Sequence, residues 1–271
     1  MKQNNLSFND AFLCRYLQMA PAALAAERTM ECRILSVKDF ARPVLDVGCG
    51  DGVFARVLFS DRVDTGIDPD PVEIAMARAW NIYDELLVCT GSAVPKPDGS
   101  YQTVFSNSVL EHIPELDPVL REVHRLLAPN GIFYVTIPTD RWERTVLPSR
   151  LLYWLGFETL ADRYCRFYNA FWKHYRALSV NDWTSLFESA GFKVDHCQTY
   201  SSADMTTMLD ILTPLATPSM ISKRMLGRWI PFPRVRTLTA RVLCPLLGRA
   251  IDHLDRGVPG GLVFFALKKQ C

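Results

Sequence analysis

The sequence predicts an α/β protein in which a parallel sheet is covered by helices on both faces. Short apolar strands alternate with helices between residues 43 and 137, and a glycine-rich turn follows the first strand. Strands that are apolar along their whole length and separated by helices are typical of parallel sheets buried on both faces. With 271 residues, of which 49% are hydrophobic and 22% charged, the chain can bury a full core.

The expected elements follow one another in a regular order. A helical segment over 8–38, rich in alanine and interrupted at Pro21, precedes the first strand. We expect strands at 43–47, 63–67, 85–89, 103–106 and 132–137, and helices at 52–59, 71–80 and 116–127. A helix at 180–190, ended by Gly191, and strands at 192–199 and 261–267 complete a sheet of about seven strands.

Two long segments interrupt this order. Residues 140–178 and 201–259 lack the strand–helix alternation, and each follows the carboxyl end of a strand. Because an open α/β sheet binds its ligands at that edge, both segments are expected to cover a ligand site. The predicted organisation is an N-terminal helical segment, 1–41, followed by a single domain, 42–271, that accepts both insertions.

The glycine-rich turn after the first strand indicates a nucleotide or nucleoside ligand. The strand leads into Gly48-Cys49-Gly50-Asp51-Gly52, where a helix is expected to begin. Alternate glycines permit positive φ angles and close approach of a ligand, and the helix N-terminus offers free N–H groups. Asp68 ends the second strand about 20 residues after Gly48, at the position of an acid that accepts ribose hydroxyls. Val53 stands where a dinucleotide-binding pattern has its third glycine.

Four motifs follow one another along the chain as VLDVGCGDG, GIDPD, SNSVLEHIP and HRLLAPNGIFYVTIP, and they cover about residues 42–139. Together they resemble the class I S-adenosylmethionine-dependent methyltransferases. The resemblance implies the Rossmann-like fold of that family, with seven strands in the order 3-2-1-4-5-7-6 and the last strand antiparallel. It also implies an enzyme that uses S-adenosyl-L-methionine as cofactor and releases S-adenosyl-L-homocysteine.

The resemblance also assigns roles to particular residues. It implies that the methionine part of the cofactor is held by Asp46, Gly48, Cys49, Gly50, Asp51 and Gly52. Asp68 would bind the ribose hydroxyls, and Pro69 would lie near the adenine. Ser92, where many relatives have an aspartate, and Ala93 would border the adenine ring. Asn107 and Ser108, at the end of the fourth strand, would face the methyl donor.

Two histidines are candidates for a catalytic base. His112 follows the fourth strand at the ligand edge, and His174 lies in the first insertion. The alternative role for His112 is to fix its loop by hydrogen bonds. His124, His196 and His253 are expected to be packing or structural residues. No set of histidines and acids has the spacing of metal ligands, so no metal is predicted.

Cysteine usage and the chain start favour a cytoplasmic protein. The eight cysteines are irregularly spaced and form no C-x-x-C pair, so we expect reduced, packed cysteines rather than a disulfide framework. The first ten residues, MKQNNLSFND, lack the apolar core of a signal peptide, and no run of about 18 apolar residues predicts a membrane span.

The two insertions differ in composition. The first is aromatic, with Trp142, Tyr153, Trp154, Phe157, Tyr164, Phe167, Tyr168, Phe171, Trp172 and Tyr175 interleaved with arginines. A net charge of +1 favours a cap over the domain rather than a nucleic-acid surface. The second is basic and amphipathic, with Asp210 as its only acid between Met205 and Ile251. Its helical apolar spacing predicts peripheral contact of 223–251 with anionic lipid, or else a cap helix that docks on the domain.

The predicted function is methyl transfer by in-line displacement to a small, lipid-linked or glycan-linked acceptor, with oxygen as the expected acceptor atom. An RNA or protein methyltransferase is the first alternative, although Asn107-Ser108-Val109-Leu110 stands where amino-directed nucleic-acid enzymes often carry N-P-P-Y or D-P-P-Y. A non-catalytic protein that binds S-adenosylmethionine is the second. The expected location is the cytoplasm, including the inner face of the membrane.

Overall fold

Seven strands form one mixed sheet in the order β3-β2-β1-β4-β5-β7-β6, which confirms the predicted topology. The computed structural model describes residues 4–230, 233–255 and 259–270. The strands are β1 (Val44–Val47), β2 (Val63–Asp68), β3 (Tyr83–Val88), β4 (Tyr101–Asn107), β5 (Leu127–Pro138), β6 (Phe192–Tyr200) and β7 (Leu262–Lys269). As predicted, β7 runs antiparallel to both of its neighbours, β5 and β6, whereas β1 to β5 pair in parallel.

Helices cover both faces of this sheet. The helices α3 (Val53–Leu58) and α4 (Pro71–Ala79) pack on one face, and α5 (Leu116–Leu126) and α9 (Val180–Ser189) on the other. Each face has its own core: Phe105 and Phe264 belong to the first, and Phe133, Phe187 and Phe265 to the second. Neighbouring strand residues such as Phe264 and Phe265 point to opposite faces, so an apolar strand contributes to both cores.

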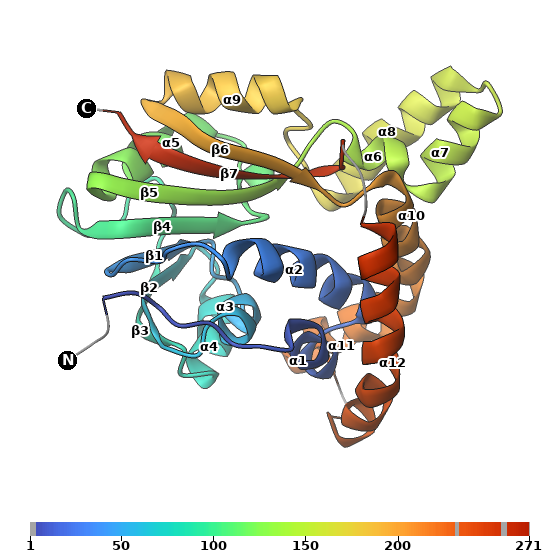
Figure 1. Ribbon diagram of the computed structural model, residues 1–271, viewed down its shortest axis with the longest axis horizontal. Helices are drawn as coiled ribbons and strands as arrows, with labels where there is room; N and C mark the ends of the chain where they lie inside the picture. Colours follow the sequence, from blue (N-terminus) through green and yellow to red (C-terminus); the bar gives the residue numbers. More distant parts are fainter. Residues whose placement is uncertain (1–3, 231–232, 256–258, 271) are drawn as a thin grey trace.

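The remaining helices gather beyond the carboxyl ends of the parallel strands (Figure 1). The N-terminal segment contributes α1 (Phe12–Met19) and α2 (Ala22–Leu35), separated at Pro21 as expected. The first insertion contains α6 (Trp142–Thr145), α7 (Leu147–Trp154) and α8 (Glu158–Trp172). The second contains α10 (Ala203–Leu212), a 3-10 turn (Thr213–Ala216), α11 (Thr217–Leu226) and α12 (Pro233–Leu254). The edge that binds ligands in such sheets is therefore enclosed from three parts of the chain.

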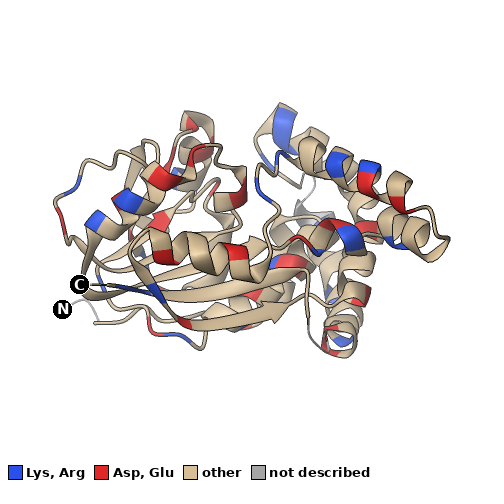
Figure 2. Cartoon of the chain, turned by 90° about the horizontal axis from the view of Figure 1, so that it is seen from above, with Lys and Arg blue, Asp and Glu red and all other residues tan. Residues whose placement is uncertain are grey.

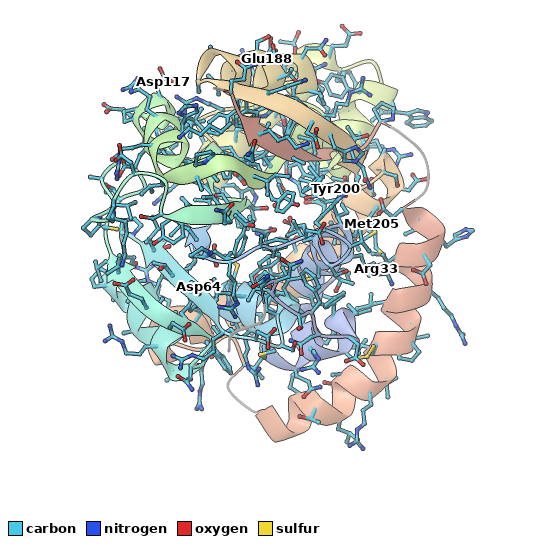
Figure 3. The ribbon with its side chains drawn as sticks, turned by 60° about the vertical axis from the view of Figure 1, so that its left-hand side comes forward. Arg33, Asp64, Asp117, Glu188, Tyr200 and Met205 are labelled. Carbon is cyan, nitrogen blue, oxygen red and sulfur yellow. A yellow bond between two sulfur atoms is a disulfide. The ribbon has the colours of Figure 1, made fainter. Side chains whose placement is uncertain are left out.

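Cys14 on α1 and Cys244 on α12 form a disulfide with Cα atoms 5.3 Å apart, visible in Figure 3 beside α12. The expectation of reduced cysteines is wrong for this pair. The two residues lie 230 positions apart, and only the packing of α1 against α12 brings them together, so no local spacing indicates the bond. Within the described part of the chain, no helix is both long and apolar enough to cross a membrane.

Candidate functional site

A cavity of about 620 Å³ opens at the carboxyl ends of β1, β2 and β4. This volume lies within the range of small-molecule and cofactor pockets. The predicted site residues that line it are Gly48, Cys49, Gly50, Asp51, Asp68, Asn107, Ser108, His112 and His174. Residues that sequence reasoning missed come from α2 and from both insertions, and include Glu27, Arg28, Trp142, Tyr168, Trp172, Lys223 and Trp229.

The loop after β1 adopts the geometry that its glycines permit. Gly48, Gly50 and Gly52 have φ angles of 79°, 52° and 76°, a region that other residues rarely occupy. A Cβ atom on Gly48 would lie 2.5 Å from Val109 Cγ1, so only glycine fits where the loop meets the segment after β4. A Cβ on Gly50 would find its nearest neighbour 3.9 Å away, because this residue faces the cavity.

Asp68 is oriented toward the cavity by the backbone around it. Its Oδ2 accepts a hydrogen bond from Gly50 N at 3.0 Å, and its Oδ1 accepts one from Asp70 N at 2.9 Å. A carboxylate oxygen can accept a second hydrogen bond, so both oxygens keep capacity for a pair of ribose hydroxyls. The glycine loop and Asp68 therefore fit the methionine part and the ribose of S-adenosylmethionine, respectively.

Other predicted cofactor residues lie outside the cavity lining. Asp46 is buried beneath the loop and accepts a hydrogen bond from the Tyr83 hydroxyl at 2.7 Å. Burial raises the pKa of Asp46 to about 7. Because Asp46 is buried and bonded to Tyr83, its place is beneath the loop and not at the cavity surface. Pro69, Ser92 and Ala93 are exposed at the same edge of the sheet, and the Ser92 hydroxyl lies 3.0 Å from Thr90 Oγ1.

A polar network joins α2 to the end of β4. Arg28 Nη1 donates to both carboxylate oxygens of Glu31 at 2.8 Å and to Ser108 Oγ. Asn107 Nδ2 and the Tyr200 hydroxyl also donate to Glu31, at 2.9 and 3.2 Å. Glu31 is fully buried, and Figure 3 shows Tyr200 near the middle of the molecule. The network fixes Asn107 and Ser108 at the cavity wall, with an N-terminal helix as their support.

Glu27 stands next to this network and lines the cavity. Its Oε1 lies 3.4 Å from Arg28 Nη1, and burial raises its pKa to about 7. One feature of the sequence indicates that Glu27 belongs to a buried polar site. Glu27, Arg28 and Glu31 are the only charged residues between Ala22 and Cys32 in an otherwise apolar, alanine-rich stretch. Charged side chains on such a helix are expected to have partners if the helix is buried.

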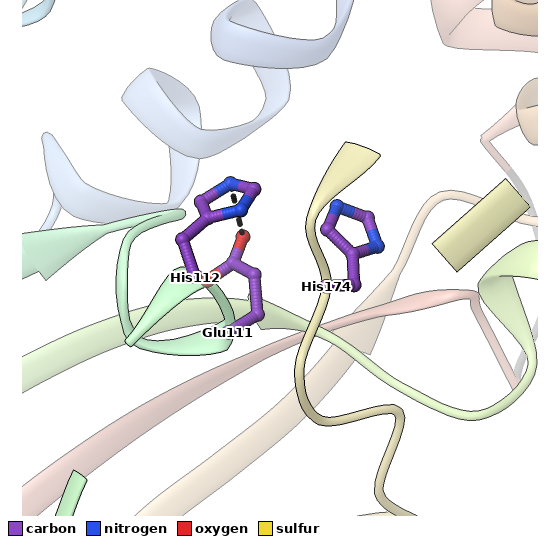
Figure 4. Close-up of side chains that lie close together, drawn as sticks. All are labelled: Glu111, His112 and His174. Carbon is purple, nitrogen blue, oxygen red and sulfur yellow. Dashed lines mark ion pairs between the residues drawn. The ribbon is translucent and has the colours of Figure 1, made fainter. Parts of the chain in front are cut away.

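The two candidate bases lie close together (Figure 4), and both line the cavity. The His112 and His174 rings have centroids 5.1 Å apart, and Glu111 Oε1 lies 3.8 Å from His112 Nε2. Burial lowers the pKa of both histidines, that of His174 to about 4, so both rings are neutral at pH 7. Burial raises the pKa of Glu111 to about 8, and its Oε2 has no hydrogen-bond partner in the described structure.

These three side chains also form a group of the kind that can hold a metal ion. One ligand atom from each of Glu111, His112 and His174 lies within 4.8 Å of the others. Sequence reasoning found no such spacing because His174 lies more than 60 positions further along the chain, in the first insertion. The fold thus brings together three side chains that spacing along the sequence does not connect.

The second insertion closes the cavity on the cofactor side. Lys223 on α11 forms ion pairs of 3.0 Å with both Asp51 and Glu73, and Trp229 Nε1 donates to Asp51 Oδ2 at 2.9 Å. The Lys223 ammonium lies 4.7 Å from the centre of the Trp229 ring. The Lys223 ammonium is thus paired with two acids of the domain, and its side chain is only 20% exposed.

Fold and site together define a Rossmann-like domain that holds a nucleoside cofactor at the carboxyl edge of its sheet. Residues 8–197 match the family model described as "Methyltransferase domain". The chain belongs to this family, the class I S-adenosylmethionine-dependent methyltransferases, whose cofactor is S-adenosylmethionine.

Individual relatives are distant and cover the chain unevenly. The chain is 28% identical over 195 residues to a sterol 24-C-methyltransferase of Aspergillus fumigatus, covering 68% of this chain and 48% of that protein. It is 31% identical over 125 residues to a 2-methyl-6-phytyl-1,4-hydroquinone methyltransferase of Synechocystis, covering 41% and 39%. A possible histamine N-methyltransferase from Thermotoga maritima has the same fold, with a TM-score of 0.54 and 15% identity over 96% of this chain and 92% of that one. The chain spans about half the length of the first curated relatives it matches.

Proposed function

We propose that the protein transfers a methyl group from S-adenosylmethionine to an oxygen atom of a small, lipid-linked or glycan-linked acceptor. The observation that carries this proposal is the shared cavity: the glycine loop and Asp68 line one part, and His112 and His174 line another. A methyl donor held by the first part would face an acceptor held by the second. The two named relatives are consistent with an acceptor of lipid character, since one acts on a sterol and the other on a phytyl hydroquinone.

Chain residues then have distinct roles in the reaction. The cofactor, when bound, supplies an activated methyl group, so alignment of the acceptor contributes most of the rate. Asp68 and the Gly48–Gly52 loop bind the cofactor, and Asn107 and Ser108 border the methyl donor. A hydroxyl acceptor loses its proton as it is methylated, and a neutral His112 or His174 can accept that proton at pH 7.

No resident metal enters this mechanism. The Arg28 guanidinium interacts unfavourably with a proton on His112 and favourably with the Glu111 carboxylate. Glu31 and Glu27 pair with Arg28 and balance its charge, so repulsion by Arg28 does not decide whether a cation binds there. We assign the two histidines to proton transfer because both rings are neutral at pH 7 and line the cavity.

The proposed location is the cytoplasmic face of an anionic membrane, with contact through 223–251. On α12, Leu238, Val242 and Leu246 recur every fourth residue and all three are more than half exposed. Exposed Arg241 and Arg249 flank this stripe. The alternative, a cap helix that docks on the domain, also applies to α12, which packs through Ala240 and Ile251 and is joined to α1 by the disulfide. Leu238, Val242 and Leu246 lie outside that packed face. An exposed apolar stripe beside arginines suits an anionic lipid surface.

Calorimetry tests the core of the proposal. The full chain is titrated with S-adenosylmethionine and, separately, with S-adenosylhomocysteine, and saturable heat is expected for both. Methyl transfer from isotope-labelled cofactor is then assayed with sterol, hydroquinone, glycolipid, RNA and protein acceptors, with the acceptor atom read from the product. Absence of binding by either cofactor form would overturn the proposal. Binding without transfer to any acceptor would favour a non-catalytic binding protein, and transfer to RNA or protein would favour the first alternative.

A further inference from the structure

The first insertion projects from the rest of the molecule as a helical hairpin. Figure 1 shows α7 and α8 side by side, with their connecting turn at the far right of the view. The Tyr153 hydroxyl donates to Asp162 Oδ1 at 2.6 Å, and Ser149 Oγ lies 3.4 Å from Cys165 Sγ, so the two helices are bonded to each other. The hairpin is thus held together by contacts between its two helices.

Its outward surface is unusually apolar. On α7 an exposed stripe runs through Leu147, Leu151, Trp154 and Leu155, and on α8 a second runs through Leu160, Phe167 and Phe171. At the turn, Trp154 is 79% and Phe157 57% exposed, and a Cβ on Gly156 would meet no atom within 4 Å. Isolated exposed apolar residues are ordinary, but a contiguous group of this size marks an interaction surface.

The opposite side of α8 belongs to the active-site cavity. Tyr168 and Trp172 line the cavity, and Trp142 Nε1 donates to the Tyr168 hydroxyl at 3.2 Å. One helix therefore has an apolar outer stripe and an aromatic inner face at the acceptor side of the cavity. Ring contacts join the two surfaces, because the Phe171 ring centre lies 5.1 Å from that of Trp172, and the Trp172 ring centre lies 6.3 Å from that of Tyr168.

We propose that the α7–α8 hairpin inserts its turn into the interfacial region of an anionic membrane and guides a membrane-borne acceptor to the cavity. This inference rests on the proposed function, and it assigns lipid contact to a segment other than 223–251. Tryptophan and phenylalanine at a turn are the residues that favour the membrane interface.

The hairpin carries Arg150, Arg163 and Arg166 against Glu158 and Asp162, and two of its arginines are placed to meet anionic headgroups. Exposed Arg163 and Arg166 lie within and beside the outer stripe of α8, and neither forms an ion pair within the described ranges. Arginines next to exposed aromatic side chains complement anionic headgroups while the rings enter the interface. In Figure 2 the hairpin, at the right of the view, carries separate basic and acidic positions in a mostly uncharged ribbon.

Vesicle sedimentation of the full chain tests the inference, with phosphatidylcholine vesicles that contain or lack phosphatidylglycerol. We expect the double variant Trp154→Ser, Phe157→Ser to lose at least tenfold in partitioning to the anionic vesicles. The double variant Arg163→Gln, Arg166→Gln should lose most of its dependence on phosphatidylglycerol. The matched control is Trp80→Ser, Val72→Ser, which removes an exposed tryptophan and an exposed valine at α4, and it should partition like the wild type.

Calorimetry with S-adenosylhomocysteine accompanies each variant, and unchanged affinity shows that the cavity and the fold are intact. Wild-type partitioning by the Trp154→Ser, Phe157→Ser variant would overturn the hairpin inference while leaving the proposed function standing. Loss of cofactor binding by the wild type would instead overturn the proposed function. A wild-type dimer that becomes a monomer in the hairpin variant, measured by light scattering, would identify the face as a contact between copies and also overturn the inference.

Discussion

Lys223 and Asp51 form an ion pair of 3.0 Å that fastens the second insertion to the glycine loop. The same ammonium lies 3.0 Å from Glu73, so two acids from different parts of the sheet domain hold one residue of α11. Both acids line the cofactor side of the cavity. The insertion therefore lines the same cavity as the glycine loop, and on the proposed function we expect its contacts to loosen when the cofactor exchanges.

Replacing Lys223 should speed release of the cofactor product. In Lys223→Met both ion pairs are lost and the hydrogen bond from Trp229 to Asp51 remains, so we expect the cavity to open more often. Hydrogen bonds to charged groups contribute about 1.5–3 kcal/mol, which predicts a rise of about tenfold or more in the dissociation rate of S-adenosylhomocysteine. Stopped-flow displacement measures this rate. Arg224→Met removes a neighbouring exposed cation and should leave the rate unchanged. An unaltered rate in Lys223→Met would contradict the role given to its ion pairs with Asp51 and Glu73.

Asp68→Ala should weaken cofactor binding by about ten- to a hundredfold while the fold stays intact. The variant removes the acceptor of the ribose hydroxyls and also the acceptor that orients Gly50 N. Asp68→Asn keeps one oxygen and should fall between the alanine variant and the wild type. Calorimetry gives the affinities, and circular dichroism checks the fold. Wild-type affinity in the alanine variant would exclude Asp68 from the site.

The sheet was predictable because its signal is local. Each apolar strand ends in a turn or a polar residue. The glycine loop, Asp68 and the segment around Asn107 each lie at the end of a strand, so together they indicate the carboxyl edge of the sheet. The largest difference in extent is β5, which begins at Leu127 rather than near Ile132, because Leu127 still pairs with Tyr101 on β4.

The arrangement of the helices around the cavity was less predictable because it depends on contacts between distant segments. Glu31 meets Tyr200 across 169 positions, Lys223 meets Glu73 across 150, and Cys14 meets Cys244 across 230. The spacing of apolar residues predicts helices and strands, but it does not indicate contacts between segments so far apart. The exposed stripe of α12 illustrates the same limit: helical spacing identified the apolar residues, but a sequence cannot say which face of an amphipathic helix the protein covers.

The lowered histidine pKa values predict the pH dependence of methyl transfer, which can be measured when a methyl acceptor has been identified. A base must be unprotonated, so kcat/KM should be level above neutral pH and fall about tenfold per unit once the pH is below the pKa of the base, which lies under 6.5. His112→Gln or His174→Gln, whichever removes the base, should lose about a hundredfold at pH 7 and flatten the profile. Dialysis against EDTA should leave the wild-type rate unchanged. A rate that is lost on dialysis and restored by a divalent metal would assign both histidines to a metal site instead.

Glu111 predicts a loss of stability as the pH rises. Its pKa is about 8 in the folded protein because the carboxyl is buried, against 4.5 when it is free in water. Between these values the folded state holds a proton that the unfolded state has released, so the free energy of unfolding falls with rising pH by at most about 1.4 kcal/mol per unit. Above the folded pKa both states are ionised and this contribution becomes constant.

Glu111→Gln cannot ionise, so its stability relative to the wild type should rise from pH 5 to pH 8 and then level off. Urea unfolding at pH 5, 6, 7, 8 and 9, followed by fluorescence, measures the difference. Glu188→Gln changes an exposed carboxyl on α9, labelled in Figure 3, and should follow the wild-type curve. A constant difference between Glu111→Gln and the wild type across this range would mean that Glu111 is ionised in the folded protein at neutral pH, and that a positive group or bound cation compensates its charge.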